Sequence, residues 1–152
     1  MKHSNLVEVL RKAGCAVALL SGSVFATDYT WLANPESGDW LTGVNWLVGG
    51  AETAWTAGSG NTATFGASAT KDVDVDGSVA VSTLTVNDDY SFTNGTLTVE
   101  GNFSVAAGKT ATVESALQQT SSSTRFAKTG SGTLVVNGDA SHTNSFYRFA
   151  AP

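Results

Sequence analysis

Hydrophobic and polar residues alternate along much of the chain, in short runs that end at glycine, asparagine or aspartate. In residues 72–77, Val73 and Val75 fall on one face of an extended chain and three aspartates fall on the other. This period of two is typical of a strand with one buried face. Residues 101–102 are predicted to form a turn, and the polar run 118–124 a loop or bulge. The alternation predicts strands at residues 62–65, 79–86, 90–92, 96–100, 103–105, 110–113 and 133–136.

One type of strand recurs along the chain. The pattern Thr-Leu-x-Val occurs at residues 83–86, 96–99 and 133–136, each time near glycine, asparagine or aspartate. A single strand or hairpin buries too little apolar area to be stable. Repeated strands between tight turns predict an all-β fold in which similar strands stack, as in a β-solenoid. Asn-Gly pairs also occur in hairpins, so the pattern leaves an antiparallel β-sandwich as the alternative.

The most regular copy lies in residues 128–138, which read Lys-Thr-Gly-Ser-Gly-Thr-Leu-Val-Val-Asn-Gly. Together with Phe126 and Ala127, this segment resembles the autotransporter-associated β-strand repeat, also called the passenger-associated transport repeat. The resemblance implies a right-handed parallel β-helix in a large secreted or surface-displayed bacterial protein, and it favours the solenoid over the sandwich. The residues that carry the repeat motif are Lys128, Gly130, Gly132, Leu134, Asn137 and Gly138.

The chain departs from the family pattern directly after this motif. Members usually continue through a Gly-Gly-Thr-like turn, whereas this chain runs through the aromatic residues of 145–149 to Pro152. We therefore expect residues 67–152 to form solenoid repeats that are truncated at the C-terminus, or that belong to a small secreted relative.

Residues 1–26 carry the pattern of an export signal. Basic residues precede a short apolar stretch, 13–22, and small residues stand before a cleavage point after Ala26. The apolar stretch is too short for a permanent membrane span. We predict a signal peptide, and the resemblance implies a secreted or cell-surface protein of a Gram-negative outer membrane.

Composition excludes several classes of partner and site. Cys15, the only cysteine, lies in the predicted signal peptide, so the mature chain would have no disulfide, thiolate metal site or cysteine nucleophile. The formal net charge of −5 argues against binding to nucleic acid or to anionic membrane surfaces. No later apolar run is long enough for a transmembrane helix.

Residues 27–66 contain all four tryptophans of the chain and differ from the repeats that follow. One interpretation is an N-terminal cap, because the terminal unit of a stacked fold must cover an otherwise exposed core. The alternative is a carbohydrate-binding module, in which exposed indoles stack on the rings of extracellular glycans. Buried indoles favour the cap and exposed indoles the glycan site. The residues concerned are Trp31, Trp40, Trp46 and Trp55.

Candidate catalytic and metal-binding residues are few. His142 is the only histidine outside the signal segment, in a predicted loop, and no Gly-x-Ser-x-Gly motif surrounds a serine. Asp72, Asp74 and Asp76 could offer oxygen ligands to Ca²⁺. However, alternate side chains of one strand lie roughly 6–7 Å apart, so we expect solvated charges that discourage strand pairing. We predict no enzyme, no cofactor and no metal site.

The resemblance therefore implies a structural function, as a passenger or stalk that is displayed at the cell surface and mediates adhesion. Its expected partners are extracellular glycans or other molecules of host or cell surfaces. We also expect self-association through the open end of the solenoid, because unpaired strand edges bind other strands.

Overall fold

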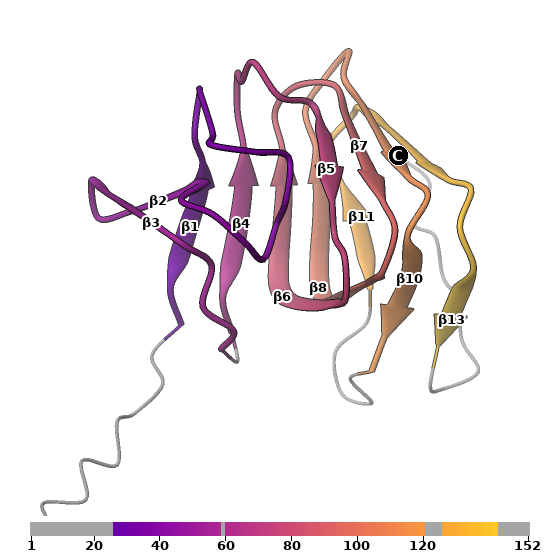
Figure 1. Cartoon of the computed structure of the whole chain (residues 1–152). Coiled ribbons are helices and arrows are strands. Elements are labelled where there is room, and N and C mark those ends of the chain that lie inside the picture. Colours follow the sequence, from indigo (N-terminus) through magenta and orange to yellow (C-terminus); the bar gives the residue numbers. More distant parts are fainter. Residues whose placement is uncertain (1–25, 59, 121–125, 143–152) are drawn as a thin grey trace, which may run out of the picture.

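The computed structural model describes residues 26–58, 60–120 and 126–142, so most of the predicted signal segment lies outside the described residues. Within these ranges every regular element is a β-strand. The chain forms a parallel β-solenoid of about four turns, which confirms the predicted fold class (Figure 1). The antiparallel sandwich is therefore wrong. In the described part of the chain, no helix is long and apolar enough to cross a membrane.

Strands of successive turns stack on three faces. The first face holds β1, β4, the second halves of β6 and β8, and β11. The second holds β5, β7, β9 and β12. The third holds the first halves of β6 and β8, with β10 and β13. The strands are β1 (Asp28–Trp31), β2 (Trp46–Val48), β3 (Ala51–Thr53), β4 (Thr62–Phe65), β5 (Asp72–Asp74), β6 (Ser78–Val86), β7 (Tyr90–Thr93), β8 (Thr96–Val105), β9 (Thr110–Val113), β10 (Ala116–Gln119), β11 (Ala127–Thr129), β12 (Thr133–Val136) and β13 (Ala140–His142).

The core is built of inward side chains that stack from turn to turn. On the first face Ala63 lies beside Leu84, and Leu84 beside Phe103, in consecutive strands. All three are fully buried. The predicted inward residues Val73 and Val75 are buried as well. Full burial of a large aliphatic or aromatic side chain contributes about 1.5–3 kcal/mol, so these columns are the main source of stability.

Two predictions of local structure are wrong. Residues 101–102 do not form a turn, because β8 continues through them and bends between the third and first faces. Gly101 fits this bend because a Cβ there would lie 2.8 Å from the Ser82 carbonyl oxygen. Gln118 and Gln119 lie in β10 rather than in a loop, with Gln119 turned inward and buried. Stacking on β8 overrides the polar character of this strand.

The three Thr-Leu-x-Val copies do not stack on one another. They lie in the second half of β6, the first half of β8 and β12, which belong to three different faces. The Asn94-Gly95 pair, with φ angles of 56° and 51°, has the left-handed backbone of a hairpin turn. Here it turns a corner between β7 and β8, which lie in different sheets. The recurring Thr-Leu-x-Val pattern therefore indicates one type of strand, and its copies do not occupy equivalent positions in successive turns of the solenoid.

Candidate functional site

The four tryptophans lie inside the N-terminal end of the solenoid. β2 and β3 fold back antiparallel on β1, and Trp31 pairs directly with Trp46. The side chains of Trp40 and Trp46 are 0% exposed, that of Trp31 is 2% exposed and that of Trp55 7%. The Trp46 ring centroid lies 4.9–5.1 Å from those of the other three indoles. These indoles leave almost no face on which a sugar ring could stack.

A buried asparagine holds the loop that covers this end. The Asn45 side chain is 0% exposed; its amide donates to the carbonyls of Asp39 at 2.7 Å and Thr42 at 2.8 Å. Its oxygen accepts from the Ser37 backbone N–H at 2.9 Å. The same loop pairs with the edge of β5, because the Trp40 N–H donates to the Asp74 carbonyl at 2.8 Å. The cap therefore closes the second face as well as the first.

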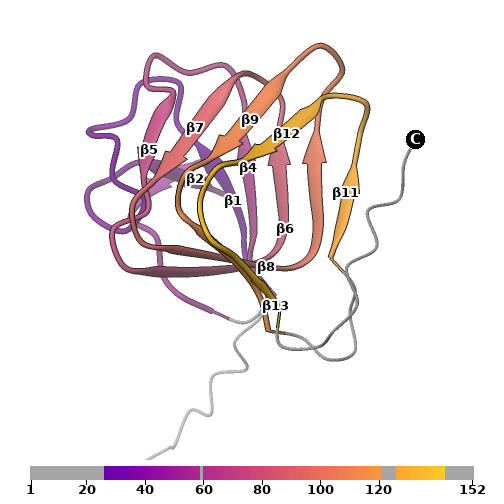
Figure 2. The same ribbon diagram turned by 90° about the vertical axis from the view of Figure 1, so that its right-hand side faces the viewer.

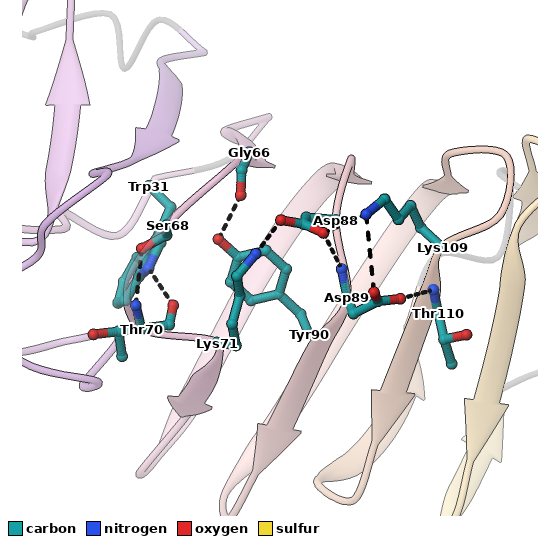
Figure 3. A network of polar contacts seen from close by, with 10 residues as sticks. All are labelled: Trp31, Gly66, Ser68, Thr70, Lys71, Asp88, Asp89, Tyr90, Lys109 and Thr110. Carbon is teal, nitrogen blue, oxygen red and sulfur yellow. Dashed lines mark hydrogen bonds and ion pairs between the residues drawn. The ribbon is translucent and has the colours of Figure 1, made fainter.

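An ion-pair network joins three successive turns of the solenoid at the corner between the first and second faces (Figure 3). Asp88 accepts from Lys71 of the preceding turn and, at 2.6 Å, from Lys109 of the following turn. Asp89 accepts from the Thr110 N–H at 2.8 Å. The two lysines lower the pKa of Asp88, Lys109 first, and Asp88 in turn raises the pKa of Lys109.

Sequence reasoning missed this network, because residues 87–89 only separate the predicted strands 79–86 and 90–92. The lysines stand 17 and 21 residues from Asp88. Paired positions in neighbouring strands of the second face are separated by 19 to 23 residues, as in Asp72–Ser91, Ser91–Thr112 and Thr110–Thr133. Once the number of residues in one turn of the solenoid was known, Asp88 could therefore have been matched with Lys71 and Lys109.

Tyr90 connects the network to the core. Burial raises the pKa of its hydroxyl to about 12, so this group stays protonated and donates to the Gly66 carbonyl at 2.7 Å. The Lys71 ammonium lies 5.0 Å from the centre of the Tyr90 ring, within the range of a cation–π contact. The network thus ties the outer corner to the packed interior.

A shallow groove of about 320 Å³ crosses the second face beside these residues. Its polar groups can exchange hydrogen bonds with a ligand, but the Tyr90 ring, 3% exposed, gives little surface for stacking. The groove therefore suits weak polar contacts and lacks the aromatic platform expected of a sugar site. Its lining residues are Lys71, Asp72, Asp89, Tyr90, Ser91, Thr110 and Thr112.

The repeat motif forms the last described turn, which Figure 2 views end on. Lys128 lies in β11 beside Phe103, on the core side of the sheet, and it is partly exposed. Its ammonium donates to the Gly130 carbonyl at 2.6 Å and also to the Gly132 carbonyl. Leu134 continues the column above Ala111 in β12, and it is only partly buried.

The glycines of the motif are required by close backbone contact. A Cβ at Gly130 would overlap the Val105 carbonyl oxygen, and one at Gly132 the carbonyl oxygen of Ala106. Gly130 also has a φ of 70°, in the left-handed region. At Gly138 a Cβ would overlap the Ser115 carbonyl oxygen, and the preceding Asn137 N–H donates to the Val113 carbonyl at 2.8 Å. These glycines let the turn lie against the preceding one.

The remaining candidates do not converge on one site. His142 ends β13 and lies in a strand, so its prediction as a loop residue is wrong. Asp72 and Asp76 are exposed on the outer surface, and the Asp74 carboxylate accepts from the Asp76 N–H at 3.0 Å. Among the described residues, no group of three or more acidic, histidine or cysteine side chains could hold a metal ion.

Comparison with known proteins identifies no relative. No protein-family model, no curated protein and no solved structure matches this chain.

Proposed function

We propose that this chain is a structural, surface-displayed passenger or stalk of an autotransporter-type secreted bacterial protein, with an adhesive role. The observation that carries the proposal is the asymmetry of the solenoid. The N-terminal end is closed by a dedicated tryptophan-rich cap, and the last described turn is a glycine-punctuated strand unit of a kind that can be repeated. Such stacked units make an extended, rigid body with little internal machinery, which suits a spacer or a display surface.

Surface display is testable on intact cells. The full chain, with an epitope tag in the β2–β3 turn at Gly49-Gly50, is fused to an outer-membrane translocator barrel in a Gram-negative host. This turn accepts an insertion because nothing lies within 4 Å of a Cβ at either glycine. We expect a mature N-terminus at Thr27 and a tag that external protease removes from whole cells. The control fusion lacks residues 1–26 and should stay inside. A tag retained inside the cell for both fusions would contradict the proposal.

The competing carbohydrate-binding function predicts a different result. Purified mature chain is titrated with mixed soluble glycans while tryptophan emission and acrylamide quenching are recorded. Because the indoles are buried, we expect blue-shifted, poorly quenched emission that no glycan changes. Emission that shifts in a saturable manner on addition of a glycan would favour the binding module over the stalk.

A further inference from the structure

The bond at which the predicted export signal would be cut lies at the start of the first strand. β1 begins at Asp28, two residues after Ala26, so no linker separates the cleavage point from the folded body. Asp28 already pairs with Thr62 of β4, the strand beside β1 (Figure 1). Ala26 lies so close to Gly60 that a Cβ added to this glycine would be 3.2 Å from the Ala26 Cβ. The scissile bond therefore lies against the first turn of the solenoid.

Thr27, the residue directly after this bond, is held through its backbone. Its N–H donates to the Asn61 side-chain oxygen at 3.1 Å, and its carbonyl accepts from the Thr62 N–H at 3.0 Å. Asn61 is 2% exposed, and its side-chain nitrogen donates to the Thr56 carbonyl at 2.9 Å. The acceptor of the Thr27 N–H is therefore itself fixed by the cap.

These contacts oppose proteolysis of the folded chain. A peptidase binds its substrate as an extended segment and needs the chain free on both sides of the bond that it cuts. Backbone groups held in a sheet become available only when that part of the fold opens, so cleavage follows the population of the open form. The exposed side chain of Ala26 does not remove this requirement. Cleavage still needs Thr27 to leave both hydrogen bonds and β1 to separate from β4.

We propose that closure of the first turn makes the Ala26–Thr27 bond inaccessible to signal peptidase, so that the export signal must be removed before this turn folds. Thr27 and Asn61 stand 34 residues apart, and the N-terminal part of a chain is synthesised first. The cleavage point is therefore available before the residues that later hold it. This inference rests on the export step of the proposed function, and it adds the order of cleavage and folding.

Hydrolysis changes the charge of this end and preserves its contact. Water adds across the amide and the C–N bond breaks. The Ala26 carbonyl carbon gains the water oxygen and becomes a carboxylate, and the Thr27 nitrogen takes the protons and becomes an ammonium. The ammonium has N–H groups that can donate to the Asn61 oxygen as the amide does. Folding after cleavage therefore fixes the new N-terminus in the first turn.

The test is digestion of the purified, folded full chain by a bacterial signal peptidase in detergent micelles, followed by mass spectrometry. A matched variant carries a flexible glycine–serine linker between Thr27 and Asp28, which keeps residues 1–27 and separates the bond from β1. We expect the linker variant to be cut after Ala26. The folded wild type should be cut more than about tenfold more slowly, because only this chain must open its first turn.

Two further variants test the role of Asn61. Asn61→Ala removes the acceptor of the Thr27 N–H, so the folded variant should be cut faster than the wild type. Asn102→Ala, at an exposed position of the same face, should resist cleavage as the wild type does. Far-UV circular dichroism establishes that each chain is folded.

The linker variant separates the two ways in which the inference could fail. Equal rates for the folded wild type and the linker variant would overturn the proposed order while leaving the export signal intact. A linker variant that is not cut after Ala26 would overturn the cleavage point, and with it both the inference and the export step of the proposed function.

Discussion

The first and the last described turns of the solenoid are built differently. At the N-terminal end, large aromatic side chains fill the interior and antiparallel strands cover the edge, with Asn45 holding the loop. At the C-terminal end, Lys128 and the glycine turn leave the edge of the last strand uncovered by any described strand. The first end buries a large aromatic area, whereas the apolar side chains of the last described turn are only partly buried. Stability should therefore be concentrated at the first end.

The largest effect is expected from truncation within the cap. Trp46→Ala removes a fully buried ring in contact with Trp31, Trp40 and Trp55, and should lower the free energy of unfolding by about 3–5 kcal/mol. Leu134→Ala at the other end should cost less than about 2 kcal/mol, because this side chain is only partly buried. Urea titration followed by circular dichroism measures both. Equal losses at the two ends would show that the comparison is wrong.

An intermediate effect should follow from crowding the glycine turn. Gly132→Ala places a Cβ against the Ala106 carbonyl oxygen and should cost about 1–3 kcal/mol in unfolding free energy. Gly66→Ala is the matched control, because nothing lies within 4 Å of a Cβ there and its φ is not left-handed. The control should stay within about 0.5 kcal/mol of the wild type in the same titration. An unchanged free energy of unfolding for Gly132→Ala would mean that the last described turn of the solenoid does not pack closely against the preceding turn.

The smallest effect is expected at the ion-pair network, midway between the ends. The lowered pKa of Asp88 means that its contribution to stability is complete above its ordinary pKa of 3.8 and is lost as the pH falls below that value. Asp88→Asn should therefore reduce the melting temperature slightly at neutral pH and weaken its fall on acidification. The reduction should shrink in high salt, because the groups are accessible to solvent.

Asp76→Asn is the charge-matched control for this prediction. Asp76 is exposed and makes no ion pair among the described residues, so its replacement should lower the melting temperature at neutral pH by less than Asp88→Asn does. If the melting temperatures of Asp88→Asn and the wild type depended on pH in the same way, the ion-pair network would not contribute to stability.

The sequence by itself determined which residues face inward. Val73 and Val75 are buried as their alternation predicts, because a strand places every second side chain on the same face. It also determined that the fold is all-β, since short strands between glycine and asparagine turns need neighbours of their own kind. The pattern did not separate a solenoid from an antiparallel sandwich, and only the resemblance of residues 126–138 favoured the solenoid. The sequence also indicated a turn at Gly130 and Gly132, because glycine tolerates the close backbone contacts of a tight turn.

Only the tertiary structure decided which strands lie together. The length of a turn varies along the chain, so Thr-Leu-x-Val copies came to lie on three faces and Asp88 met lysines from two other turns. The inward direction of Lys128 was hidden as well, because a lysine in a polar, glycine-rich segment reads as a surface charge. Its place follows from pairing with Phe103, a residue 25 positions earlier. Contacts of this range depend on how the whole stack is registered, which no local pattern encodes.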